Sequence, residues 1–152
     1  FWFHAAPNAP AIDTVWAIQI DELRLLYGFP DVGGGLKAAI HYGGTPTHWR
    51  TIDRTVHDGE IHEIVELLGR YVPGVHGKLM REVVCAYTNT RDRHFAVDAH
   101  PAHPRALVVS ACSGHGFKFA SAMGEAASQW TLDGAAKLDL SLFSFERLRA
   151  RP

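Results

Sequence analysis

The chain has 152 residues, of which 47% are hydrophobic and 20% are charged, which is the composition of an ordinary globular domain with a core of its own. The formal net charge is −1 with no basic run or acidic tail, which argues against nucleic acid or an anionic membrane surface as a partner. No apolar stretch approaches the roughly 20 residues of a membrane span, and no targeting signal is recognisable, so we expect a cytoplasmic protein. Cys85 and Cys112 are too far apart for a paired redox or zinc motif; we expect free thiols, with a single disulfide as the alternative.

The first part of the chain predicts three strands. Strands over 15–20 and 23–29 flank a turn at Asp21-Glu22. A third strand over 36–42 follows the flexible turn Gly33-Gly34-Gly35.

A loop over 43–57 then leads to a helix predicted over 59–71, with Asp58 as its N-cap and Pro73-Gly74 as its stop. One face of this helix carries apolar residues at helical spacing: Ile61, Ile64, Val65 and Leu68.

Three further strands are predicted over 82–88, 94–99 and 106–111, and a glycine turn at 113–116 opens a second helix over 116–131. The expected inward face of that helix is Phe117, Ala120, Gly124, Ala127 and Thr131. Consecutive strands joined by short turns predict an α+β fold, with a largely antiparallel or mixed sheet and two main helices.

The second helix should end at Gly134, and the tail over 138–143 alternates weakly, so we expect it to pack across the surface.

The glycine turn supplies a GxG pattern as Gly114-His115-Gly116, but Phe119 occupies the third glycine position of a dinucleotide fingerprint. The pattern therefore fails as a Rossmann phosphate loop. It is either a structural strand-to-helix turn or, because Lys118 follows it, a site for a carboxylate or an anionic ring edge at a helix N-terminus.

Cys85 lies inside the strand-like run 82–88, where a small buried hydrophobic residue is the ordinary interpretation and a reactive thiol is the alternative. On a strand, Tyr87 would share its face. A ligand that touched Cys85 would then also meet the Tyr87 hydroxyl.

Lys37 and His41 share one face of the strand over 36–42. Facing inward, they would need a buried polar partner or a function; on an edge strand, both would lie in water. The glycines before Lys37 favour the first interpretation, because they let a ligand or a backbone approach closely.

Four residues in and after the strand predicted over 94–99 could form a metal site: His94, Asp98, His100 and His103. The prolines at 101 and 104 give this segment a poor geometry for metal ligands, so we expect a surface loop and no metal site.

Four short motifs occur in one order along the chain: Tyr27-Gly28-Phe29-Pro30, Gly35-Leu36-Lys37 followed by His41, Cys85-Ala86-Tyr87-Thr88, and Ser113-Gly114-His115-Gly116-Phe117-Lys118-Phe119. Together they resemble the monomeric sarcosine oxidase and N-methyltryptophan oxidase family, FAD-dependent enzymes of the D-amino acid oxidase-like superfamily. The resemblance covers about residues 23–147. It implies that residues 1–152 are the C-terminal substrate-binding and catalytic portion of such an enzyme, and that the N-terminal FAD-binding Rossmann unit is absent.

The resemblance assigns the cofactor residues. Cys85 matches the cysteine that binds FAD covalently through the 8α-methyl carbon of the flavin. Lys37 matches the lysine near flavin N5 that activates dioxygen. The turn that faces the pyrimidine edge of the flavin matches Ser113, Gly114, His115, Gly116, Phe117 and Lys118.

The resemblance also assigns substrate residues. His41 and Tyr87 match residues beside the substrate amine, Lys118 matches a cation that holds the substrate carboxylate, and Tyr27 matches a wall of the pocket. In catalytic terms Lys37, His41, Tyr87 and Lys118 form the expected constellation.

The implied reaction is oxidation of the C–N bond of N-methyl or cyclic secondary amino acids, with electrons passing through FAD to oxygen and hydrogen peroxide formed. The expected partners are this substrate, oxygen and the missing N-terminal half. The alternatives are a catalytically silent remnant or subunit that binds a partner without turnover, and a small domain that binds an apolar ligand.

Overall fold

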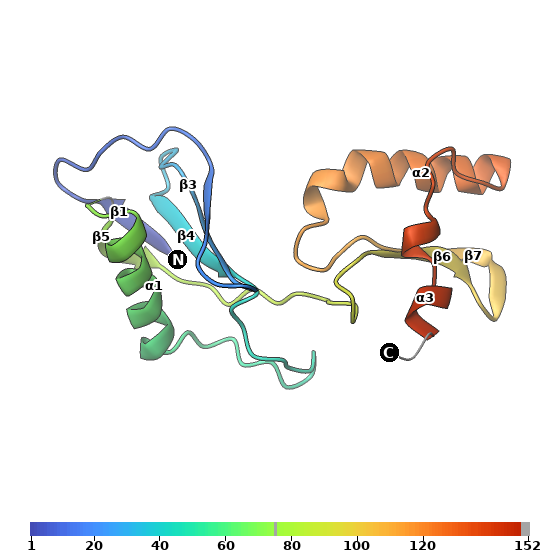
Figure 1. The fold of residues 1–152 in the computed structure, drawn as a ribbon, viewed down its shortest axis with the longest axis horizontal. Coiled ribbons are helices and arrows are strands. Elements are labelled where there is room, and N and C mark those ends of the chain that lie inside the picture. The colour runs from blue at the N-terminus through green and yellow to red at the C-terminus, as the bar shows by residue number, and fades with distance from the viewer. Residues whose placement is uncertain (75, 150–152) are drawn as a thin grey trace. The chain divides into compact units, whose positions relative to one another are not determined.

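A computed structural model describes residues 1–74 and 76–149 of the chain (Figure 1). The chain forms two compact units, the first over Phe1–Cys85 and the second from Ala86 onwards. Both units combine helices with antiparallel strands, which confirms the α+β class. Within the described residues, no helix has both the length and the apolar character needed to cross a membrane.

The first unit contains a five-stranded sheet in the order β2-β3-β4-β1-β5, in which every neighbouring pair is antiparallel. The strands are β1 (Trp2–Ala5), β2 (Trp16–Gln19), β3 (Leu25–Phe29), β4 (Leu36–His41) and β5 (His76–Arg81). The strands predicted over 15–20, 23–29 and 36–42 are therefore confirmed. Because β4 lies between β3 and β1, it is an interior strand.

Helix α1 (Asp58–Tyr71) packs on one face of this sheet and closes the first core (Figure 1). Strand alternation directs every second side chain toward the helix, and the helix contributes the face predicted from its spacing. The buried members of this core are Phe3, Leu26, Ala38, Ile64 and Leu68.

The N-cap of α1 is His57, and the expectation of Asp58 is wrong by one residue. His57 has extended backbone, and its N–H donates to the Glu60 carboxylate at 2.9 Å. This bond gives the N–H of the N-cap residue a partner, as in a capping box. Asp58 instead lies in the first turn, where its negative charge favours the positive end of the helix dipole.

The strand predicted over 82–88 does not form: β5 ends at Arg81, and residues 82–90 are irregular. A strand needs a neighbour for its backbone groups. Here the carbonyl of Val84 accepts from the Arg54 guanidinium at 3.3 Å, and that of Thr88 accepts from the Ser113 N–H at 3.0 Å. The β-branched and aromatic residues over 82–88 have the sequence pattern of a strand, but this segment pairs with no neighbouring strand among the described residues.

The second unit is built on an antiparallel hairpin of β6 (Ala96–His100) and β7 (His103–Ser110), which confirms the last two predicted strands with shifted ends. Then follow the 3₁₀ helix η1 (Phe117–Phe119), α2 (Ala120–Asp133), the 3₁₀ helix η2 (Ser141–Phe143) and α3 (Glu146–Arg149). The second core consists of Phe95, Val97, Met123, Ala126 and Leu140. The predicted tail therefore contributes Leu140 to a core.

The inward face predicted for the second helix is wrong. Met123 and Ala126 are buried with Trp130 packed against them, whereas Phe117 is 96% exposed. The regular helix begins at Ala120 after η1, so counting its turns from the glycine turn placed the face out of phase. Its end is confirmed, because Gly134 caps it in the left-handed conformation with a φ of 81°.

Leu68→Ala should lower the free energy of unfolding by about 2–5 kcal/mol, because it leaves a cavity where a fully buried side chain joins α1 to the sheet. Urea denaturation followed by circular dichroism measures this change. Glu66→Ala, at an exposed position of the same helix, should change the free energy by less than about 0.5 kcal/mol. Equal effects of the two variants would contradict this account of the core.

Candidate functional site

Lys37 lies on the face of the first sheet that is turned away from α1. Its neighbours Leu36 and Ala38 are buried on the α1 side, so alternation directs Lys37 to the other side. The side chain is half-buried, and β4 is paired along both edges. The alternative of an edge strand in water is therefore wrong.

Aromatic rings surround the ammonium group of Lys37. Its Nζ lies 5.0 Å from the ring centroid of Phe29, 5.5 Å from that of Trp2 and 5.9 Å from that of Tyr27. Ring faces attract a cation through their quadrupole. Within residues 1–74 and 76–149 no carboxylate forms an ion pair with Lys37, so its charge is held in place without being neutralised.

Tyr27 and His41 lie on the same face as Lys37. Tyr27 is opposite Ala39 in the β3–β4 register and therefore diagonal to both Lys37 and His41. The rings of Tyr27 and His41 meet edge to face with centroids 6.4 Å apart. Three of the predicted site residues are thus brought together by one pair of strands.

A second cation completes this surface. Arg81 pairs with Trp2 in the β1–β5 register, and its guanidinium lies 3.9 Å from the Trp2 ring centroid. We call the surface formed by Trp2, Tyr27, Phe29, Lys37, His41 and Arg81 the aromatic–cation face.

The Phe1 amino group donates to the carbonyl oxygen of Ala38 on β4 at 3.1 Å. Burial lowers the pKa of this amino group, and the charge of Lys37 lowers it further. Arg81 also lowers this pKa, as expected for a nearby cation.

The thiol of Cys85 is exposed and free, so the interpretation as a buried hydrophobic residue is wrong. Cys112 is likewise exposed and free. Because residues 82–90 form no strand, the expectation that Cys85 and Tyr87 share a strand face is also wrong. Both residues are instead presented from irregular backbone.

The glycine turn folds back on the end of β7. Ser113 and Gly114 have left-handed backbone, with φ values of 48° and 75°. At Gly116 a Cβ atom would lie 1.6 Å from the carbonyl oxygen of Ala111, so only glycine fits there. His115 contacts the Ser113 carbonyl oxygen through Nδ1 at 2.8 Å and stacks on Phe95 at a centroid distance of 4.9 Å.

The glycine turn joins the segment that follows Cys85 in sequence. Ser113 is 1% exposed, and its N–H donates to the carbonyl oxygen of Thr88 at 3.0 Å. Its hydroxyl donates to the His94 carbonyl oxygen at 3.1 Å and accepts from the Thr90 N–H at 3.4 Å. Two motifs of the sequence are therefore placed side by side within the second unit, with Tyr87 next to Thr88.

The expected helix N-terminus at the glycine turn is displaced. Helix α2 begins at Ala120, after the three residues of η1, so the positive end of its dipole lies beyond the turn. Lys118 is exposed on η1, with its Nζ 5.4 Å from the Phe119 ring centroid. Phe117 beside it is 96% exposed.

The predicted site residues thus form two groups, one in each unit. Tyr27, Lys37, His41 and Cys85 belong to the first unit. Those of the second unit are Tyr87, Ser113, Gly114, His115, Gly116, Phe117 and Lys118.

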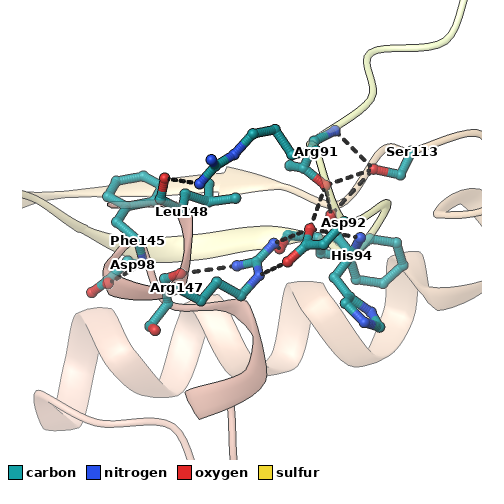
Figure 2. A network of polar contacts seen from close by, with 11 residues as sticks. Arg91, Asp92, His94, Asp98, Ser113, Phe145, Arg147 and Leu148 are labelled. Carbon is teal, nitrogen blue, oxygen red and sulfur yellow. Dashed lines mark hydrogen bonds and ion pairs between the residues drawn. The ribbon is translucent and has the colours of Figure 1, made fainter. Parts of the chain in front are cut away.

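A polar network in the second unit, shown in Figure 2, was not predicted from the sequence. Arg147 of α3 donates from Nε to Asp92 Oδ2 at 2.6 Å, and this contact holds the pKa of Asp92 well below its usual range. Arg91 donates to the carbonyl oxygen of Leu148. Asp92 and Arg147 are 55 residues apart, and no local pattern links them.

Two histidines at the turn of the β6–β7 hairpin contact each other. The rings of His100 and His103 stack with centroids 5.1 Å apart. Among the described residues, no group of three or more His, Cys, Asp or Glu side chains is placed to hold a metal ion.

Gly116→Ala should destabilise the protein by about 1–3 kcal/mol or more, because the added methyl group meets a backbone carbonyl that cannot move aside alone. Gly124→Ala is the matched control. A Cβ atom there meets nothing within 4 Å, and alanine favours the helix by up to about 1 kcal/mol. Thermal unfolding compares the two. A stable Gly116→Ala variant would contradict the close approach.

A family model described as FAD dependent oxidoreductase matches residues 3–130. Three curated proteins illustrate the similarity. The monomeric sarcosine oxidase of Streptomyces avermitilis is 36% identical, over 100% of this chain and 42% of its own length. The monomeric sarcosine oxidase of a Bacillus species is 42% identical, over 81% of this chain and 32% of its own length. The N-methyl-L-tryptophan oxidase of Yersinia pestis is 36% identical, over 88% of this chain and 36% of its own length.

These matches are partial with respect to the relatives. The chain spans 32–42% of the length of the three proteins. The family model runs from residue 3 to residue 130, so the matched region includes Cys85, the glycine turn and every member of the aromatic–cation face except Trp2.

Proposed function

The chain belongs to the FAD dependent oxidoreductase family, and on that premise we propose that residues 1–152 are the C-terminal substrate-binding and catalytic portion of an amine oxidase. Its substrates are N-methyl or cyclic secondary amino acids, and oxygen is its electron acceptor. The observation that carries the proposal is the un-neutralised Lys37 ammonium among three aromatic rings, on the face that also presents Tyr27 and His41. The relatives are a sarcosine oxidase and an N-methyl-L-tryptophan oxidase, which supports the substrate class.

The residues present fit FAD. An exposed thiol at Cys85 can form a thioether without unpacking a core. Gly116 allows the backbone of the glycine turn to fold tightly, and the exposed Lys118 beside it suits an anionic group. Aromatic rings and two cations on the aromatic–cation face suit a flat ring system that gains electron density.

When bound, FAD would supply the two-electron oxidation of the C–N bond to an imine, which water hydrolyses, and the transfer of the electrons to dioxygen with hydrogen peroxide formed. Lys37 supplies a fixed positive charge for the negative charge that develops on oxygen. Its aromatic surroundings hold that charge in place without removing it.

Tyr27 and His41 are the substrate residues that we propose in the first unit. Their edge-to-face contact restrains both rings, and the half-buried imidazole of His41 can hydrogen-bond the substrate amine. In the second unit, the resemblance assigns the Tyr87 hydroxyl to the substrate amine and the exposed Lys118 ammonium to the substrate carboxylate.

In this proposal, the Rossmann unit that binds the FAD phosphates comes from outside these residues. So does a further cation that pairs with the substrate carboxylate together with Lys118. The chain spans less than half of its relatives, which leaves room for both. The competing proposal, a silent remnant or partner-binding subunit, rests on the same partial span. The next experiment separates the two.

Covalent flavin at Cys85 is tested by placing this chain in the Streptomyces avermitilis relative instead of the segment that it matches. After acid precipitation, we expect flavin absorbance in the protein pellet. Cys85→Ser should move this absorbance to the supernatant, whereas Cys112→Ser, which changes the other exposed free thiol, should leave it in the pellet. Flavin in the supernatant of the unchanged graft would refute the covalent link. Flavin in neither fraction would favour the silent remnant.

Lys37→Met in the same graft should slow oxygen consumption with sarcosine by about 10²–10³-fold, the effect of removing one electrostatic group from a charged transition state. Bleaching of the flavin by sarcosine without air should continue, because that step does not involve oxygen. Lys78→Met, at an exposed position of β5, is the control and should leave both rates unchanged. An oxygen electrode and anaerobic absorbance measure the two steps. Equal loss in both would assign Lys37 to amine oxidation instead.

A further inference from the structure

Arg147 makes more contacts than an ordinary surface arginine. Its side chain is 16% exposed, and its guanidinium reaches both carboxylate oxygens of Asp92, at 2.6 Å from Nε and 3.3 Å from Nη2. It also donates to the carbonyl oxygens of Ser144, at 2.9 Å, and Phe95. A planar fork is required for this set, because the acceptors lie on different sides of the guanidinium.

Asp92 in turn organises the loop before β6. Its Oδ1 accepts from the Thr90 hydroxyl at 3.0 Å and from the His94 N–H at 3.2 Å. The Arg93 N–H donates to the Thr90 carbonyl oxygen at 3.2 Å, and Arg93 has left-handed backbone with a φ of 60°. The loop is therefore tight, and Arg147 holds the carboxylate at its centre (Figure 2).

The same loop is tied to the glycine turn on its other side. Ser113 contacts the backbone of Thr88, Thr90 and His94. Polar contacts thus form a continuous chain from α3 to Thr88, the residue that follows Tyr87.

We propose that Arg147 is a positioning residue: through Asp92 it holds the backbone over 88–94 against the glycine turn, and so sets where Tyr87 is presented. The inference rests on the proposed function for the role of Tyr87. The hold itself is a property of the second unit and can be tested separately.

This role differs from support of the core. The second core consists of apolar side chains from β6, α2 and the segment around Leu140, with Phe95 beside them. Arg147 adds polar contacts to a loop and to two carbonyl groups, so its removal should loosen the loop while the apolar core persists.

The test uses the graft described above with Arg147→Met, which keeps length and removes the fork, and with the nearly isosteric Asp92→Asn. Hydrogen exchange measured on peptides containing Ser113 reports the bond from its N–H to Thr88 directly. Both variants should speed this exchange by about tenfold or more and raise the KM of the graft for sarcosine, because Tyr87 is displaced. Arg149→Met, at an exposed position of the same helix, is the control and should change neither.

Two comparisons sharpen the result. Arg147→Lys keeps the charge without the fork and should restore only part of the protection. The double variant Arg147→Met with Asp92→Asn should speed exchange by less than the product of the two single effects, because both changes break the Arg147–Asp92 contact.

Unchanged exchange at Ser113 in both single variants would overturn the proposal. So would loss of the near-ultraviolet circular dichroism signal in both, because Arg147 would then be a purely structural residue. If the unchanged graft holds no flavin, the proposed function fails, but the exchange at Ser113 still decides whether Arg147 positions the loop.

Discussion

The packing of α1 against one face of the five-stranded sheet determines the orientation of every candidate functional side chain on β3 and β4. Leu26 and Ala38 are completely buried beneath the helix. Because strand side chains alternate between the two faces of the sheet, this burial places Tyr27, Lys37 and His41 on the opposite face. A shift of one residue in the β3–β4 register would exchange the two sets, so the apolar core and the polar chemistry specify the same alignment.

The second unit relies on a different balance of forces. Its apolar core is small, and the segments that carry its candidate site residues have little regular structure. Hydrogen bonds to backbone groups give these segments their shape, with the buried hydroxyl of Ser113 as the junction. Such contacts are directional, whereas apolar packing is not. They suit a site whose atoms must be held at defined positions.

The sequence predicted what depends on local periodicity. The helical spacing of Ile64 and Leu68 identified the buried face of α1, and the strand period placed Lys37 and His41 on one face of β4. It failed where distant partners decide the outcome: residues 82–88 resemble a strand but lack a neighbour. The phase of α2 was likewise lost, because the short η1 turn before it has no distinct sequence signature.

In the candidate site too, the features set by local sequence were predicted and those set by distant partners were not. Lys37 and His41 were identified from their place in an apolar strand, and the resemblance to a family supplied Cys85 and the glycine turn. Nothing in the sequence pairs Asp92 with Arg147, since opposite charges at a separation of 55 residues are common in any chain. Only the folded backbone selects this pair. The aromatic rings around Lys37 could not be predicted either, because Trp2 reaches it through the pairing of β1 with β4.

The left-handed backbone of Ser113 carries an evolutionary consequence. A non-glycine residue at a φ of 48° costs about 1–3 kcal/mol, a strain that glycine would relieve. Glycine would also remove the hydroxyl that connects Thr90 and His94. The hydrogen bonds lost, at about 1 kcal/mol each, would offset the strain relieved, so serine can persist at a position whose backbone conformation favours glycine.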